Sequence, residues 1–271
     1  MIINFLNYHT RLTMKIRPRI IPCLLIQNGK LVKTKKFKNP RYLGDPINAV
    51  KIYNEKEVDE LCILDICATK NGIRPNFELL EEIASEAFMP LSYGGGIGNI
   101  EDARRIFKIG YEKIILGNTL YTNNNLIKEL IRAFGSQSIT AAIDYRYNVF
   151  GQAQCYRMSG KKKCKIGVEE MAKYVCDLGV GEILLYSIDN DGKREGYDIN
   201  MIKKISEIVN IPVVPVGGAG KLSHIKEALE VGKASAVAAG SMFVYWGNKN
   251  AVLINYPSEK EFMEEGIYYE K

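Results

Sequence analysis

Two glycine-rich turns carry the residues best suited to hold an anion. The first, Gly94-Gly95-Gly96-Ile97, follows the apolar stretch Met89–Tyr93, and the second, Gly217-Gly218-Ala219-Gly220, follows Pro212–Val216. Glycine lets the backbone turn sharply, so that N–H groups can face an anion where the next helix begins. Neither turn is a Walker A loop or a GxGxxG dinucleotide motif. Their separation of about 120 residues is nearly half the chain and indicates an internal repeat.

Carboxylates are the expected proton carriers, because the chain has only two histidines, His9 and His224. Asp144 is the first candidate for catalysis. It ends the apolar stretch Ala141–Ile143, where loss of solvent would perturb its pKa and suit it to acid–base work. The alternative is a carboxylate that is merely held by nearby lysines or by N–H groups of a turn.

A strongly basic stretch supplies the cationic candidates. Six Lys and Arg residues, Lys33 among them, lie between Lys30 and Arg41. The stretch predicts either a solvated loop or a mobile loop that closes on a phosphorylated substrate.

The bulk composition limits the function classes. A chain of 271 residues with 46% hydrophobic residues is long enough for one barrel, and we expect one domain over 1–271 with 1–16 as an N-terminal extension. The net charge of +6 suits anionic ligands, but it is weak support for nucleic-acid binding, which we do not expect. No apolar run is long enough for a membrane span. Six cysteines without a CxxC pair predict a reduced, cytoplasmic protein with no metal or organic cofactor.

Strands and helices must alternate to position these residues. Apolar strand patterns and amphipathic helix patterns follow one another eight times, which predicts a parallel (β/α)₈ TIM barrel built from two half-barrel repeats. The expected strands are 19–26, 60–66, 89–93, 113–116, 139–143, 182–187, 212–216 and 236–240. The expected helices are 46–56, 76–86, 99–109 (capped at Asn99), 124–134 (ending at Gly135), 168–177, 201–209 and 223–231, with a long polar insert over 145–167.

Ligands of such barrels bind at the carboxyl ends of the strands. Gly218 with Gly240 and Ser241 predicts a phosphate pocket on the last two strands. Gly96 with Asn118 and Thr119 predicts a sister pocket in the first half. The alternative for each pocket is that its glycines serve only tight turns, and the recurrence in both halves weighs against that alternative.

From Arg19 to about Trp246, the chain resembles HisF, the cyclase subunit of imidazole glycerol phosphate synthase. The resemblance rests on blocks in or beside most of the expected strands, namely Arg19–Leu24, Gly44–Pro46, Asp59–Leu61, Leu64–Ile66, Gly94–Ile97, Asn118–Thr119, Ala142–Asp144, Gly181–Leu185, Ser187–Asp189, Asp191–Gly192, Gly196–Asp198 and Gly217–Gly220. It implies a barrel that receives ammonia from a HisH-like glutaminase on its amino-terminal face and passes the ammonia to a doubly phosphorylated small molecule.

The same resemblance implies the roles of individual residues. Asp144 matches a catalytic aspartate, and Lys33 matches the loop lysine. The resemblance also implies a ring of four charged residues, which matches the family's ammonia gate. The alternative is a ring of salt bridges that stabilises the barrel and takes no part in transport. The gate positions are Arg19, Glu60, Lys113 and Glu182. The phosphate positions are Gly96, Asn118, Thr119, Asp191, Gly192, Gly218, Gly240 and Ser241.

Leu25 departs from the HisF pattern, because it stands where the family has its other catalytic aspartate. A leucine cannot exchange a proton. With the blocks 33–40 and 252–257, this departure looks more like the HisF-like branch of bacterial surface-sugar amidation, in which a separate sugar amidotransferase takes part. A histidine-pathway cyclase with an altered catalytic set and a non-catalytic scaffold that activates the glutaminase are the other two functions left open.

Overall fold

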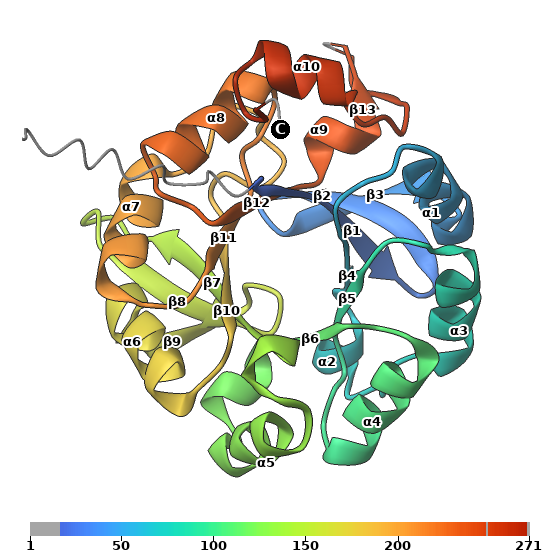
Figure 1. Cartoon of the computed structure of the whole chain (residues 1–271). Coiled ribbons are helices and arrows are strands. Elements are labelled where there is room, and N and C mark those ends of the chain that lie inside the picture. Colours follow the sequence, from blue (N-terminus) through green and yellow to red (C-terminus); the bar gives the residue numbers. More distant parts are fainter. Residues whose placement is uncertain (1–16, 248, 270–271) are drawn as a thin grey trace, which may run out of the picture.

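Eight parallel strands form a closed barrel with helices around it (Figure 1). The protein is described by a computed structural model over residues 17–247 and 249–269, so the expected extension 1–16 lies outside the described residues. Pairing of β10 with β7 closes the ring and confirms the predicted (β/α)₈ fold. In spatial order the strands are β1 (Arg19–Gln27), β4 (Leu61–Asp65), β5 (Leu91–Gly94), β6 (Lys113–Leu116), β7 (Ile139–Tyr147), β10 (Glu182–Ser187), β11 (Val213–Val216) and β12 (Ala236–Ala239).

The outer helices begin where a polar side chain satisfies free backbone N–H groups. Asn99 accepts a hydrogen bond from the backbone N of Asp102 at 2.8 Å, as its cap position predicted, and Asn76 and Asp198 cap in the same way. Predicted element bounds differ from the observed ones by at most two residues, except at β7. The helices are α1 (Pro46–Glu55), α3 (Phe77–Glu86), α4 (Ile100–Ile109), α5 (Asn124–Phe134), α6 (Val168–Leu178), α7 (Ile199–Ile208) and α8 (Leu222–Glu230), with the short α2 (Ala68–Asn71), η1 (Asn118–Tyr121) and η2 (Ser136–Ser138) between them.

Alternating side chains divide the apolar core into two parts. On β1, Ile20 and Leu24 pack in the large cluster between strands and helices, whereas Ile21, Cys23 and Leu25 pack in a smaller cluster inside the barrel. The division arises because successive side chains of a strand point to opposite faces of the sheet. Inward-facing side chains at the strand ends therefore reach the two mouths of the barrel.

The basic stretch after β1 is a hairpin, which corrects the prediction of a loop. It consists of β2 (Lys30–Lys35), antiparallel to β1, and β3 (Lys38–Gly44). Asn28 and Gly29 have φ values of 50° and 71°, the geometry of the two-residue turn that Asn-Gly favours. The second turn has positive φ values at Lys36 and Phe37, which are not residue types typical of such a turn. The sequence therefore did not predict the strand β3 that follows it.

The polar insert is also built from strands. β7 continues four residues past its predicted end and pairs with β8 (Ala153–Arg157), which pairs with β9 (Lys162–Gly167). The register places Asp144 opposite Tyr156. This second hairpin therefore covers the barrel mouth beside Asp144.

The last segment closes the ring of helices near β1 (Figure 1). It contains α9 (Ser241–Val244), the small pair β13 (Tyr245–Trp246) and β14 (Ala251–Val252), and α10 (Glu259–Glu264). Over the described ranges, no helix has the length and apolar character needed to cross a membrane.

Candidate functional site

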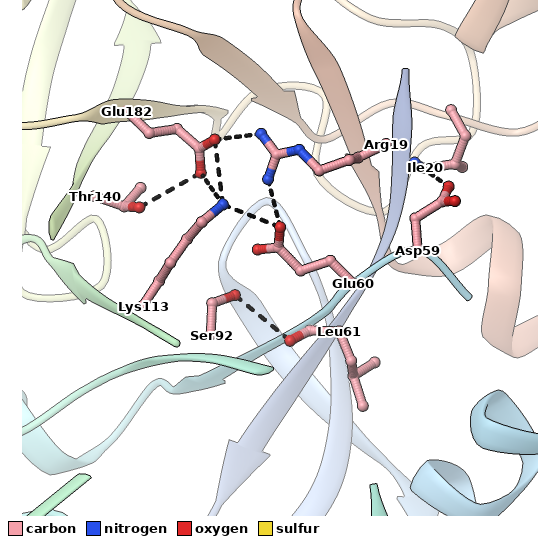
Figure 2. A network of polar contacts seen from close by, with 9 residues as sticks. All are labelled: Arg19, Ile20, Asp59, Glu60, Leu61, Ser92, Lys113, Thr140 and Glu182. Atoms are coloured by element: carbon pink, nitrogen blue, oxygen red, sulfur yellow. Dashed lines mark hydrogen bonds and ion pairs between the residues drawn. The ribbon is translucent and has the colours of Figure 1, made fainter. Parts of the chain in front are cut away.

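Four charged side chains meet inside the barrel at the amino ends of its strands (Figure 2). Arg19 donates to both Glu60 and Glu182. Lys113 Nζ lies 3.0 Å from Glu60 Oε2 and 3.2 Å from Glu182 Oε1, which closes a ring of alternating charge. Thr140 Oγ1 donates to Glu182 Oε1 at 3.4 Å. The structure thus brings together all four residues of the expected gate, whose part in ammonia transport stays a prediction.

Mutual pairing allows these charges to be buried. Glu60 and Glu182 are only 4% and 6% exposed. Burial acts to lower the pKa of the Arg19 guanidinium, but Glu182 and Glu60 outweigh it, and the pKa is raised. An uncompensated charge here would be costly, so each member depends on the others.

A cavity of about 130 Å³ lies at the opposite, carboxyl ends of the strands. Asp144 lines it from β7, Leu25 from β1 and Tyr186 from β10. Phe37 of the β2–β3 hairpin packs edge-on against the Tyr186 ring, with 4.7 Å between ring centroids. Arg157 reaches in from β8. The volume suits a group about the size of one small ring.

Asp144 is the carboxylate best placed for proton transfer in this cavity. In the described part of the chain nothing donates a hydrogen bond to its side chain. Burial, with a smaller effect from the negative charge of Asp191, raises the pKa of Asp144 to about 7. A carboxyl group with this pKa can both give and take a proton near neutral pH. The side chain that faces the same cavity from the β1 position, Leu25, is apolar.

Asp191 holds the β2–β3 hairpin against the barrel. Its carboxylate accepts hydrogen bonds from Lys33 Nζ at 2.6 Å, Thr34 Oγ1 at 2.7 Å and the backbone N of Phe37 at 3.1 Å. Tyr186 Oη donates to it at 3.2 Å. Lys33 and Asp191 are therefore a buried pair. Since a carboxylate repels phosphate, the expected phosphate contact of Asp191 stays a prediction that its own side chain does not favour.

The first glycine-rich turn lies beside an open cavity of about 480 Å³, which Gly96, Asn118 and Thr119 line together. We call these three residues the first cradle. A Cβ on Gly96 would lie 2.5 Å from the carbonyl oxygen of Ile73, so only glycine fits there. Asn118 Oδ1 accepts a hydrogen bond from Arg157 Nη1 at 2.9 Å, which directs the amide nitrogen of Asn118 away from the arginine. Arg157 lies in the stretch expected to be a polar insert, and its type and spacing gave no signal of this contact.

The second glycine-rich turn forms an almost closed cavity of about 10 Å³. A Cβ on Gly218 would lie 2.0 Å from the carbonyl oxygen of Gly196. Ser241 Oγ is buried and has no hydrogen-bond partner among the described residues. We call the predicted phosphate residues that line this cavity the second cradle: Gly192, Gly218, Gly240 and Ser241. Lys33 and Arg194 line it as well, and Arg194 was not expected.

Residues that hold a metal are not gathered anywhere in the described ranges. These ranges contain no group of three or more His, Cys, Asp and Glu side chains with suitable geometry.

The closed barrel, with a cavity at the carboxyl ends of its strands, defines the class of (β/α)₈-barrel proteins that bind ligands at that face. The model of the family described as "Histidine biosynthesis protein" matches residues 19–248. The chain belongs to this family, among the HisF subunits of imidazole glycerol phosphate synthase. The resemblance to HisF seen in the sequence is confirmed.

Three relatives illustrate the membership. A Leptospira interrogans protein, provisionally named subunit HisF of imidazole glycerol phosphate synthase, is 46% identical over 94% of this chain and 100% of its own. A Pseudomonas aeruginosa relative, provisionally named subunit hisF2, is 46% identical over 89% of this chain and 96% of its own. Subunit HisF of Exiguobacterium sibiricum is 39% identical over 82% of this chain and 88% of its own.

Proposed function

We propose that this chain is the synthase subunit of a glutamine amidotransferase. It takes ammonia through the charged ring at the amino ends of its strands and delivers it to a phosphorylated small molecule at the carboxyl ends. The observation that carries the proposal is the placement of the ring and the Asp144 cavity at opposite ends of one barrel interior. All six cysteines are free, which fits a reducing cytoplasm.

The barrel interior between the two ends favours neutral ammonia over ammonium. Its inward side chains include Ile21, Cys23, Cys62, Leu184 and Val214, all buried and without charge. An apolar path opposes a charged ion far more than a small neutral molecule. Ammonia therefore has to enter unprotonated, which requires a source docked directly on the ring. A HisH-like glutaminase on the amino-terminal face supplies it.

Asp144 performs the proton transfer at the other end. When NH₃ adds to a carbonyl carbon, the new C–N bond forms as the π electrons move to the oxygen, and the nitrogen is left with a positive charge and an extra proton. A carboxylate of pKa about 7 accepts that proton. The two cradles hold the anionic groups of the acceptor on either side of the cavity.

We favour an acceptor other than the histidine-pathway ribonucleotide, namely a nucleotide-linked sugar that a separate sugar amidotransferase helps to amidate for a surface glycan. Leu25 supports this choice, because it puts an apolar side chain opposite Asp144 where the HisF resemblance calls for an aspartate.

Cyclisation in histidine biosynthesis is the second candidate. The family model and the name of the Exiguobacterium sibiricum relative support this candidate as well as they support the first. In that case Asp144 alone would handle the protons of ring closure.

Turnover of the histidine-pathway ribonucleotide with an ammonium salt separates the two candidates. The pure chain should give no product, and a rate near that of a true cyclase would overturn the sugar-amidation proposal. Leu25→Asp is the matched variant, because a gain of cyclase activity shows that the rest of the site is intact. Stimulation of a co-purified glutaminase without any product from the barrel would instead favour a scaffold.

A further inference from the structure

The second cradle contains two buried polar atoms without partners. Ser241 Oγ and Arg194 Nε make no hydrogen bond within the described residues, and Ser241 is only 6% exposed. Both residues line the same cavity. A buried donor left unsatisfied costs free energy, so two of them at one cavity indicate a missing ligand.

The backbone of Arg194 is held in an unusual conformation at this place. Its φ of +63° is uncommon for a residue with a side chain. A Cβ on Gly220 would lie 2.2 Å from the carbonyl oxygen of Arg194, so glycine at position 220 makes room for it. Strained backbone that its neighbours maintain is concentrated at functional sites.

The far side of the guanidinium is fixed. Arg194 Nη1 donates to the carbonyl oxygen of Gly247 at 3.2 Å and to Asn250 Oδ1 at 3.0 Å, both beside the β13–β14 pair. These two bonds orient the planar group, while Nε is buried and has no hydrogen-bond partner among the described residues. An arginine held in this way is pre-organised to donate to an oxyanion.

The charges at the cavity also favour an anion. Lys33 and Arg194 bring two positive charges, and Asp191 brings one negative charge that Lys33 already neutralises. Arg194 therefore supplies the net positive charge of the second cradle.

We propose that Arg194 is an anion-binding residue of the second cradle, which donates Nε–H to the same phosphoryl group that Ser241 Oγ binds. The inference rests on the proposed function, because that function supplies the phosphorylated acceptor. The inference adds to the proposed function a cationic residue, Arg194, that binds one phosphoryl end of the substrate.

The cavity must widen when the phosphoryl group binds. Its volume of about 10 Å³ leaves room for about one water molecule, which is too little for a phosphoryl group. Lys33 lies across it, with Cε 3.1 Å from the position of a Cβ on Gly240. The Lys33 side chain therefore borders the space that the phosphoryl oxygens need, while its ammonium group is paired with Asp191.

Calorimetric titration with inorganic phosphate tests the inference on the full chain. The wild type should show two sites, one for each cradle. Arg194→Gln and Ser241→Ala should each weaken the same single site by roughly 10- to 100-fold and leave the other unchanged. The double variant should lose less than the product of the two effects, because both residues hold one ligand. Lys193→Gln, which removes an equal charge one residue away, should change neither site.

The outcomes separate this inference from the proposed function. If the wild type binds no phosphate, both the proposal of a phosphorylated substrate and the role of Arg194 are contradicted. Two wild-type sites that persist unchanged in folded Arg194→Gln would overturn only the role of Arg194. Circular dichroism confirms the fold of each variant, and Arg194→Lys, which keeps the charge without Nε, should recover only part of the lost affinity.

Discussion

Lys33 Nζ lies 2.6 Å from Asp191 Oδ1, although 158 positions separate the two residues in the chain. Both side chains are almost fully buried, at 5% and 1% exposure. The pair joins the β2–β3 hairpin to the segment after β10 and so fixes the hairpin over the barrel mouth. A lysine that looks like part of a solvated basic run is thus an internal tie between two distant parts of the fold.

Removing one member of this pair should be costlier than removing both. Lys33→Met leaves the Asp191 carboxylate buried without its counter-charge, and we expect a loss of about 3–5 kcal/mol in the free energy of unfolding. Lys33→Met combined with Asp191→Asn should recover most of that loss. Urea denaturation followed by circular dichroism measures both. A Lys33→Met variant as stable as the wild type would show that the pair does not hold the hairpin.

The ring at the amino ends should be sensitive to a single neutral substitution. Glu182→Gln leaves Arg19 and Lys113 to share Glu60, and because both cations are partly exposed we expect a loss of about 1–3 kcal/mol. Glu259→Gln is the matched control, since it removes an exposed carboxylate paired with Arg17 and should change stability by less than about 0.5 kcal/mol. Equal effects in the two variants, measured by thermal unfolding, would contradict the dependence of the ring on mutual pairing.

The raised pKa of Asp144 should give stability a particular dependence on pH. The folded state holds the proton up to about pH 7, whereas the unfolded state releases it near its ordinary value of 3.8. The folded state therefore binds more protons in this interval, and the contribution of Asp144 to stability falls as the pH rises from about 4 to 7. Asp144→Asn removes this dependence and should stabilise the protein above pH 7 by up to about 4 kcal/mol, with no gain below pH 4. Unfolding curves collected across that interval check the sign. If the free energies of unfolding of the wild type and the variant change with pH in the same way, the pKa of Asp144 is not raised in the folded state.

The second cradle should not tolerate a methyl group. In Gly218→Ala the new Cβ would meet the carbonyl oxygen of Gly196 at 2.0 Å, at a φ of +118°. Gly110→Ala shares a φ of +120° but has nothing within 4 Å, so it measures the backbone strain alone. We expect the Gly110 variant to lose about 1–2 kcal/mol and the Gly218 variant at least about 2 kcal/mol more. Phosphate titration of both should show a lost second site only in Gly218→Ala. Similar stabilities for the two variants would rule out the close contact at Gly218.

Local patterns in the sequence were enough to predict the barrel. Each helix of the ring has its own apolar stripe, several have a polar cap, and each barrel strand has a short β-branched or apolar run. These signals act between near neighbours, and so Asn99 and Gly135 marked the ends of their helices correctly. The HisF-type blocks at the strand ends placed the chain in its family.

The tertiary structure decided what the side chains at the strand ends contact. Lys33 contacts Asp191, Arg157 contacts Asn118, and Arg194 lines the same cavity as Ser241, although each pair is far apart in the sequence. The turn at Lys36 and Phe37 likewise depends on Asp191, which accepts a hydrogen bond from the Phe37 backbone. The sequence by itself determined a parallel barrel with polar residues at both mouths, because hydrophobic period and capping are local. Only closure of the barrel determined which charges are paired and which polar atoms are left for a ligand, because pairing and burial depend on groups that the fold brings together from far apart.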